Sequence, residues 1–398
     1  MRLNRTLMTQ LAEHPDDETM AEIVRLAPNL SDREVARLAK ALADSGSLLE
    51  LDGPYTDLAS TGGPSSLSTL ICPLFLCSLG FKVPALGVPG RPAGGVDVLS
   101  TIPGYRVHLV QNEVLRILDE CAYAHFLADD VFAPADALLF QYRQRTGAQA
   151  EPALVIASLL SKKLALNLKT IGLDVRVANF GNFGTTWEVA RSNAARFQRV
   201  AAIIGIRATC FLTDASFPYQ PFIGRGESLV ALDLVFREHC EGTLLEHISA
   251  CWLMAQTIAE MPDAQPPSGK LLRDIFDRNL AAQGARPEAF DERVAQTLGS
   301  PQIQICSNND GFLKIDLDGL RNVLVKLQQR DQGASQFPDP AGVVLLKKVG
   351  ERVIRGQAIA RLRIRADSPE IGEIQSLFTC SGSTERGRAP LETLRPQN

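Results

Sequence analysis

The chain has 398 residues, of which 45% are hydrophobic and 22% charged, and its formal net charge is −4. This composition is typical of a globular protein of two or three domains and excludes a disordered or fibrous chain. The charge lacks the basic excess of nucleic-acid-binding proteins, and the longest apolar run, residues 70–79, is too short to span a membrane. We therefore expect a cytoplasmic protein with a small-molecule ligand and without a nucleic-acid or membrane partner.

The eight cysteines are scattered along the chain. They form no Cys-x-x-Cys pair, and no histidine lies at metal-ligand spacing from them. Free cysteine behaves as a small hydrophobic residue, so we expect buried, reduced thiols. The sequence predicts no metal site and no cofactor.

The predicted elements change in character along the chain. The first 50 residues predict short amphipathic helices, one of them capped by Ser31, and glycine- and serine-rich turns between apolar segments follow from residue 57. A second helical stretch ends at residue 168. Strands are predicted at 173–177 and 203–213 with a long helix between them, which implies parallel pairing. Past residue 300 we expect shorter strands, at 310–315, 342–346, 350–354 and 356–359.

These elements predict an α/β fold with three parts. A helical lobe comprises residues 1–52 and 134–168, and a larger α/β lobe with a mixed sheet comprises residues 53–133 and 169–300. Residues 301–398 form a mostly β, α+β subdomain, and a loose tail follows Cys380.

Residues 57–69 carry the first candidate site. They read Asp-Leu-Ala-Ser-Thr-Gly-Gly-Pro-Ser-Ser-Leu-Ser-Thr and precede an apolar helix. Glycines let backbone N–H groups approach an anion, and hydroxyls donate further hydrogen bonds. An anion or ribose site is one interpretation of this segment, and a structural turn explains it equally well.

Ser158 and Lys162 carry the second candidate site. Residues four apart lie on one face of a helix, so the two side chains point the same way. Taken alone, an exposed lysine beside a helix-face serine is the simpler interpretation. The five histidines have no sequence-adjacent partner, and each is interpreted as a surface or core residue. The carboxylates at predicted strand ends or turns are active-site candidates, although structural capping explains them as well: Asp57, Asp97, Asp174, Asp214 and Glu227.

Several blocks resemble, in the same order, those of the thymidine and pyrimidine nucleoside phosphorylase family. They are Ser-Thr-Gly-Gly at 60–63, Ala-Pro-Ala-Asp at 133–136, Ala-Ser-Leu-Leu-Ser-Lys-Lys-Leu-Ala at 157–165 and Leu-Asp-Val-Arg-Val at 173–177. Residues 91–98 and 222–227 are more similar to the AMP phosphorylase branch. The resemblance covers roughly residues 15–320 and implies a fold like that of the class II nucleoside phosphorylases. It also implies a homodimer.

The resemblance implies the site residue by residue. Arg143, Ser158 and Lys162 match the positions that hold the pyrimidine, and a hydroxyl with two cations can bind its carbonyl oxygens and stabilise the leaving base. The substrate-binding candidates are Ser60, Thr61, Gly62, Gly63, Ser68, Thr69 and Arg91.

The phosphate side of the motif departs from the family. Where the family has Asp-Lys-His-Ser-Thr-Gly-Gly, this chain has Leu58 and Ala59 in place of lysine and histidine, and Val96 replaces a threonine. The remaining hydroxyls and amides offer dipoles but no nearby formal cation, unless Arg91 or another cation substitutes. We therefore expect that phosphate is not the efficient acceptor.

The predicted function is that of a pentosyltransferase, which cleaves or transfers the glycosidic bond of a pyrimidine nucleoside or nucleotide. A nucleoside is the expected ligand, and phosphate is one candidate for the second. The alternatives are a nucleoside hydrolase or base-exchange enzyme, and a catalytically silent nucleoside-binding protein. A phosphoribosyltransferase of the anthranilate type would share the Thr-Gly-Gly loop, but the sequence has no motif for its metal-diphosphate site.

Overall fold

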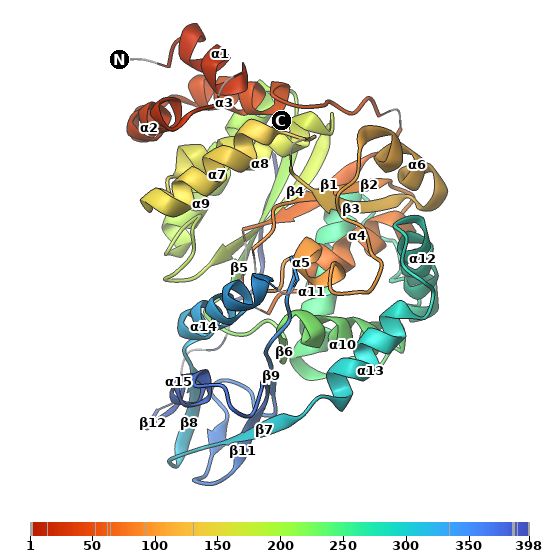
Figure 1. Cartoon of the computed structure of the whole chain (residues 1–398), viewed down its shortest axis with the longest axis vertical. Coiled ribbons are helices and arrows are strands. Elements are labelled where there is room, and N and C mark those ends of the chain that lie inside the picture. The colour runs from red at the N-terminus through yellow and green to blue at the C-terminus, as the bar shows by residue number, and fades with distance from the viewer. Residues whose placement is uncertain are drawn as a thin grey trace.

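The computed structural model describes residues 3–13, 15–51, 53–61, 63, 65–90, 92–129, 131–333, 335–383, 387 and 389–396, with the backbone alone at residue 332. Helices surround a central mixed sheet, and a smaller group of strands lies at the other end of the molecule (Figure 1). The predicted α/β fold class is confirmed. Within the described part, no helix combines the length and the apolar character needed to cross a bilayer.

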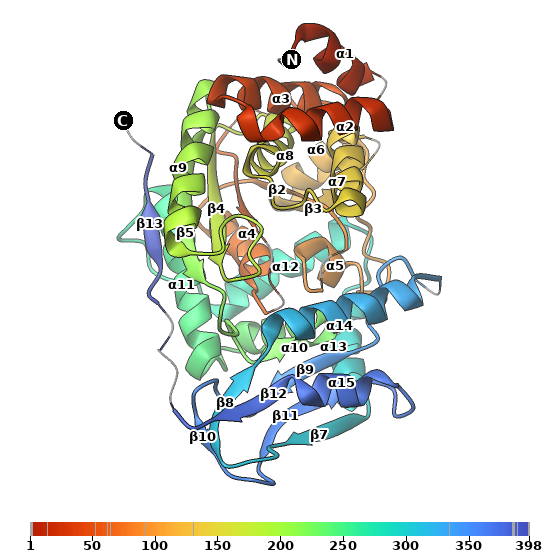
Figure 2. The same ribbon diagram turned by 90° about the vertical axis from the view of Figure 1, so that its left-hand side faces the viewer.

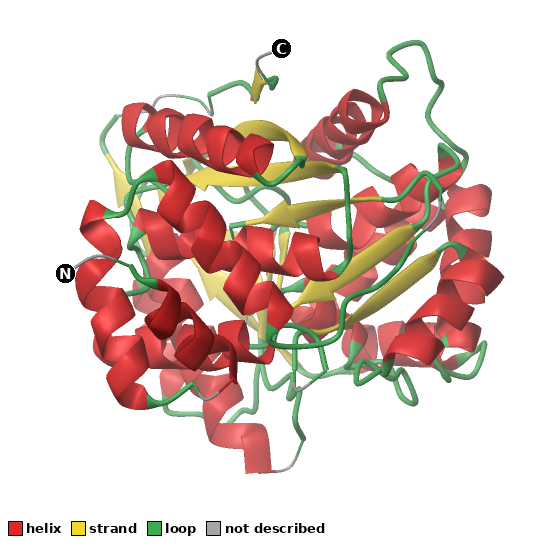
Figure 3. Ribbon diagram, turned by 90° about the horizontal axis from the view of Figure 1, so that it is seen from above, coloured by secondary structure: helices red, strands yellow, loops and turns green. Residues whose placement is uncertain are grey.

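The central sheet has the strand order β1-β4-β5-β13. Its strands are β1 (Thr56–Ser60), β4 (Thr170–Val177), β5 (Arg207–Asp214) and β13 (Glu392–Leu394). The first three are parallel, as predicted for β4 and β5 from the long helix between them, α9 (Trp187–Ile203). A second parallel pair, β2 (Val83–Gly87) with β3 (Tyr123–Leu127), joins β1 through a single bridge between Tyr55 and Lys82. Helices enclose this sheet in the view from above (Figure 3).

Two helical segments far apart in sequence pack together above the sheet (Figures 1 and 2). The first holds α1 (Arg5–Glu13), α2 (Asp17–Leu26), the short η1 (Ala27–Asn29) and α3 (Asp32–Asp44), and the second holds α7 (Pro134–Thr146) and α8 (Pro152–Ala165). Ser31 caps α3 as predicted, in a capping box with Glu34. Gly46 allows the contact between the segments, because a Cβ there would lie 2.6 Å from Pro134 Cδ.

The helical segments do not have a core of their own. One hydrophobic cluster runs from α1–α3 through α8 and α9 to β4, and it includes Leu38, Leu160 and Val175. A second cluster fills the other side of the sheet, where these helices lie: α4 (Ser68–Ser78), α5 (Gly95–Leu99), α10 (Arg225–Phe236), α11 (Gly242–Ala259), α12 (Gly269–Ala282) and α13 (Ala289–Gly299). α6 (Gln111–Cys121) packs beside β3. The three-part division of the chain at the predicted boundaries therefore stays a prediction.

The C-terminal part contains two small sheets with orders β6-β9-β11-β7 and β10-β8-β12. Their strands are β6 (Phe222–Ile223), β7 (Gln302–Cys306), β8 (Gly311–Ile315), β9 (Gly342–Leu345), β10 (Arg352–Val353), β11 (Ala358–Arg363) and β12 (Phe378–Ser381). The helices here are α14 (Leu317–Arg330), the short η2 (Asp331–Gly333) and α15 (Glu370–Ser376). In Figure 2, α14 lies between these strands and the central sheet.

The prediction of a loose tail after Cys380 is wrong for residues 392–394. They form β13, which pairs antiparallel with β5 in the register Thr393 to Phe211 (Figure 2). An edge strand presents unpaired N–H and C=O groups, and β13 satisfies those of β5. Arg191 on α9 holds the strand through both carboxylate oxygens of Glu392, at 2.8 and 2.7 Å.

Candidate functional site

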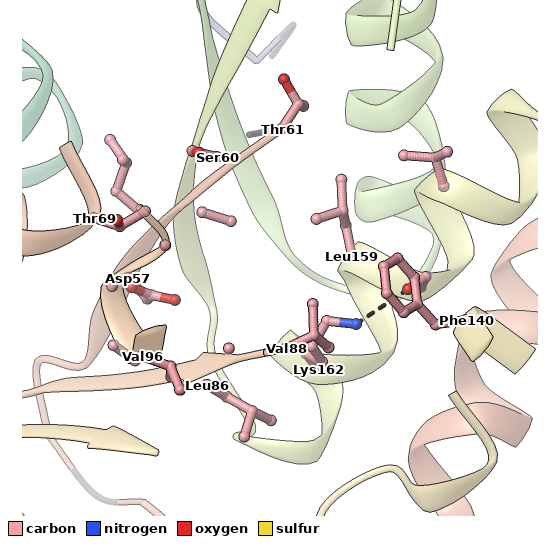
Figure 4. A pocket seen from close by; sticks show the side chains of 18 of the residues that line it. Asp57, Ser60, Thr61, Thr69, Leu86, Val88, Val96, Phe140, Leu159 and Lys162 are labelled. Carbon is pink, nitrogen blue, oxygen red and sulfur yellow. Dashed lines mark hydrogen bonds between the residues drawn. The ribbon is translucent and has the colours of Figure 1, made fainter. Parts of the chain in front are cut away.

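A cavity of about 150 Å³ lies between α7 and α8 on one side and the ends of β1, β2 and the start of α5 on the other. In Figure 4, Phe140, Leu159 and Lys162 lie on the helical side, and Asp57, Ser60, Thr69 and Val96 lie opposite. Parallel strands β1 and β2 point their carboxyl ends here, which is where α/β folds usually bind ligands.

A second cavity of about 730 Å³ adjoins the first, and Val88 and Phe140 line both. It opens toward α7 and α14, and several glutamines line it, among them Gln141 and Gln328. The first cavity alone is smaller than the roughly 300–1,000 Å³ of typical ligand pockets. A nucleoside in the first cavity would therefore extend into the second or require the two sides to separate.

Ser158 and Lys162 both line the first cavity. One helical turn apart on α8, they form a hydrogen bond in which Lys162 Nζ donates to Ser158 Oγ over 3.1 Å, and Lys162 also pairs with Asp136 of α7. Burial lowers the pKa of Lys162, although Asp136 opposes the shift. Asp136 Oδ1 has no hydrogen-bond partner among the described residues. Asp136 thus holds Lys162 in the cavity wall and balances its positive charge.

Arg143 lines the cavity but uses its guanidinium elsewhere. It donates to the backbone carbonyls of Ala148, Gln149 and Leu154, over 3.2, 2.7 and 3.4 Å. These bonds hold the turn between α7 and α8, and burial lowers the pKa of the arginine. The observed bonds give Arg143 a structural role in this turn. The contact of Arg143 with a pyrimidine stays a prediction.

Only some of the predicted substrate-binding residues line the cavity in the described structure. Ser60, Thr61, Gly63 and Thr69 line the cavity, whereas Gly62 and Arg91 lie outside the described residues. Ser68 is absent from the lining. Its buried hydroxyl instead donates to Asp174 Oδ2 over 2.9 Å, so its predicted contact with substrate is not supported by its position.

The expectation of a cradle without a formal cation is wrong, because Arg176 of β4 lines the cavity beside the loop that follows β1. A Cβ added at Gly63 would lie 3.0 Å from its Nη1. The guanidinium also donates to Ser68 Oγ over 2.9 Å and stacks on Tyr219 with 5.5 Å to the ring centroid. Only the end of the predicted strand 173–177 hinted at this residue, since side chains at carboxyl ends of parallel strands face ligand sites.

Four lysine and arginine side chains line the described cavity wall, and three of them are paired with a carboxylate, whereas Arg143 donates to backbone carbonyls. Lys162 pairs with Asp136, and the other two pairs are Lys163 with Asp57 and Arg176 with Asp174. All six side chains are buried. Carboxylates therefore offset three of the four positive charges in the described lining.

The positions that depart from the family motif are apolar in the structure as well. Leu58 belongs to the hydrophobic cluster beneath the sheet, where a Cβ added at Gly172 would lie 3.2 Å from its Cδ1. Leu58 also lines the cavity, as do Ala59 and Val96. His125, which the sequence suggested was an unremarkable core or surface residue, lines it too and is buried. Among the described residues, no group of His, Cys, Asp and Glu side chains could hold a metal ion.

Comparison with known proteins shows which sequences this chain is similar to. The chain is 28% identical to human thymidine phosphorylase over 393 residues, which cover 91% of this chain and 80% of that protein. It is 27% identical to thymidine phosphorylase of Sinorhizobium fredii over 345 residues (82% and 78%), and 25% identical to pyrimidine-nucleoside phosphorylase of Staphylococcus epidermidis over 381 residues (91% and 87%). The protein therefore resembles the thymidine and pyrimidine-nucleoside phosphorylases over most of its length.

Two other comparisons add less. No family model matches the sequence. Anthranilate phosphoribosyltransferase from Thermus thermophilus superimposes with a TM-score of 0.46 at 13% identity, covering 73% of this chain and 98% of that one. At this level of similarity no functional conclusion follows.

Proposed function

We propose that this protein is a pentosyltransferase that cleaves or transfers the glycosidic bond of a pyrimidine nucleoside or nucleotide, and that phosphate is not its efficient acceptor. The resemblance to thymidine and pyrimidine-nucleoside phosphorylases over most of the chain supports the reaction class. The observation that carries the proposal is the pairing of three of the four cations in the cavity wall with carboxylates, while Arg143 is held by backbone carbonyls.

The base side of the site keeps the chemistry of the family motif. Lys162 and Ser158 offer a cation and a hydroxyl at one point of the cavity wall. Such donors bind the carbonyl oxygens of a uracil-type ring and stabilise the negative charge that the ring gains as the C1′–N bond breaks. Their stabilising effect is larger in the transition state, because the charge develops only there.

The acceptor side favours a neutral nucleophile. Phosphate carries nearly two negative charges at neutral pH, and a cavity wall in which three of four cations are paired with carboxylates and Arg143 is turned to backbone carbonyls offers it little net attraction. Asp57 also adds a carboxylate to the cavity wall that a dianion would have to approach. In the reaction with a neutral acceptor, its oxygen bonds to C1′ and the C1′–N electron pair leaves with the base. The acceptor loses one proton to solvent, and the base gains one.

A nucleoside panel tests this function. The purified full-length chain is incubated with uridine, thymidine, cytidine and their 5′-monophosphates, with and without inorganic phosphate, and free base is measured by chromatography. Release of base without added phosphate supports the proposal. Rapid release that occurs only with phosphate contradicts the acceptor assignment, and binding without any release favours a silent nucleoside-binding protein.

A further inference from the structure

The chain segment that follows β2 forms part of the wall between the two cavities. Val88, the first residue after the strand, lines both cavities, and Pro89 and Gly90 line the second (Figure 4). Phe140 of α7 also lines both. A nucleoside that extends from the first cavity into the second must therefore contact these two shared side chains. The placement of residues 88–90 sets the width of the passage.

Asp97 of α5 fixes the end of this segment. The N–H of Gly90 donates to Asp97 Oδ1 over 2.9 Å, and the carboxylate is buried. Gly90 has a φ of +91°, which glycine adopts without strain, so the chain can turn toward α5 at this point. Val88 lies only two positions before the bonded N–H. The bond to Asp97 therefore limits the movement of Val88 as well.

Contacts from two further helices hold this region in place. Arg225, at the start of α10, donates from Nη2 to Asp97 Oδ1 over 2.9 Å and from Nη1 to the carbonyl of Pro338 over 2.6 Å. Gln328 of α14 donates to the carbonyl of Pro92 over 3.2 Å. Pro338 lies shortly before β9. The wall between the cavities is thus tied to the C-terminal part of the chain.

The ion pair of Asp97 and Arg225 is suited to positioning rather than to bond cleavage. Both residues are buried in the wall of the second cavity, and neither belongs to the described lining of the first. A buried ion pair adds little net stability, because removing both charges from water offsets most of their attraction. The two hydrogen bonds that Oδ1 accepts are directional, however, and they set where Gly90 lies relative to α10.

We propose that Asp97, held by Arg225, is a positioning residue that fixes the wall at residues 88–90 and thereby sets substrate affinity. This inference rests on the proposed function for the identity of the substrate. The wall contacts the part of the nucleoside that leaves the first cavity, whereas Lys162 and Ser158 act on the base. Loss of the positioning should weaken binding of the ground state and the transition state alike, which raises KM and leaves kcat unchanged.

Two substitutions of Asp97 test this role in the full-length chain. Asp97→Asn keeps an oxygen that accepts from the N–H of Gly90, whereas Asp97→Leu removes it. In Asp97→Leu we expect KM for the best nucleoside to rise at least about tenfold and kcat to stay within about threefold, whereas Asp97→Asn should keep both constants within about threefold. Hydrogen exchange followed by mass spectrometry should be faster at residues 88–90 in Asp97→Leu alone.

Controls separate positioning from structural damage. Asp32 also accepts from two arginines, Arg196 and Arg199 of α9, but lies outside the described lining of both cavities. Asp32→Leu should therefore change neither KM nor the exchange at residues 88–90. Asp97→Leu removes the carboxylate that pairs with buried Arg225. If its melting temperature shows that this variant does not fold, Asp97→Leu with Arg225→Met removes both charges and takes its place.

The outcomes are distinct. Unchanged KM in the folded leucine variant, or a fall in kcat alone, overturns this inference and leaves the proposed function standing. A higher KM without faster exchange at residues 88–90 also overturns it, because Asp97 would then contact the substrate directly. The same holds if Asp97→Asn raises KM as much as Asp97→Leu. A wild-type chain that releases base from no nucleoside overturns the proposed function and this inference with it.

Discussion

Arg176 and Asp174, two residues apart on β4, form a buried ion pair in which Arg176 Nε lies 3.1 Å from Asp174 Oδ2. Ser68 and Thr213 donate to the same carboxylate, over 2.9 and 2.8 Å. Asp174 thus holds the one arginine beside the Ser60–Thr61 turn in the described cavity lining, and also cancels its charge. Under the proposed function, this ion pair is the reason that the cation at this loop does not make an effective phosphate site.

Removing that carboxylate charge should improve phosphate use. Asp174→Asn keeps the shape and leaves Arg176 without a neutralising partner, so we expect phosphate-dependent base release to rise about tenfold, equivalent to about 1.4 kcal/mol in the transition state. The measurement is the initial rate against phosphate concentration, with Asp263→Asn on the surface as control. A phosphate dependence identical to that of the wild type would show that the ion pair does not control the acceptor.

Restoring the family motif on β1 also tests whether a missing cation limits the use of phosphate. Leu58→Lys with Ala59→His should raise phosphate-dependent cleavage by more than about tenfold, if the missing contact is worth at least about 1.4 kcal/mol. Because Leu58 packs in an apolar cluster, the double variant should also melt at a lower temperature. Ala59→His alone is the control for the base side. A double variant that stays folded without a gain would contradict the prediction.

Lys162 should dominate nucleoside binding. In Lys162→Ala we expect nucleoside affinity to become undetectable by calorimetry, and stability to fall by about 3–5 kcal/mol because buried Asp136 loses its partner. The variant Lys162→Met/Asp136→Asn removes both charges, so it should recover much of the stability but none of the affinity. Lys169→Met, on the surface, is the control. Unchanged affinity in the folded double variant would place the base elsewhere.

Stability should depend on pH through His125. Its folded-state pKa is about 3, below the ordinary value of 6.5, so the unfolded chain binds the proton first as pH falls. The contribution of His125 to the free energy of unfolding is therefore fully present above about pH 6.5. It is lost as the pH falls toward about 3, at about 1.4 kcal/mol per pH unit in the middle of that range. Urea unfolding at several pH values checks this. In His125→Gln the free energy of unfolding should fall less steeply with decreasing pH, by the uptake of one proton. An equal slope in the variant and the wild type would contradict this prediction.

The sequence alone determined the local features of this protein. Helical spacing placed Ser158 and Lys162 on one face of α8, the Ser31 cap marked the start of α3, and the long helix before β5 implied its parallel pairing with β4. These features depend on residues within a few positions of each other, and the same short blocks carried the resemblance to the phosphorylase family. Local pattern is sufficient in such cases because the period of a helix or strand sets which side chains share a face.

The tertiary structure alone decided which groups meet. Asp57 pairs with Lys163 from 106 positions away and Asp136 with Lys162 from 26, while β13 reaches back to β5 across the chain. No periodicity marks such partners, since they become neighbours only when separate elements pack. For the same reason only the structure shows that Arg176 and His125 line the cavity and that Arg143 and Ser68 have structural partners. The charge of a site is a sum over neighbours in space, so the packing of the chain decides it.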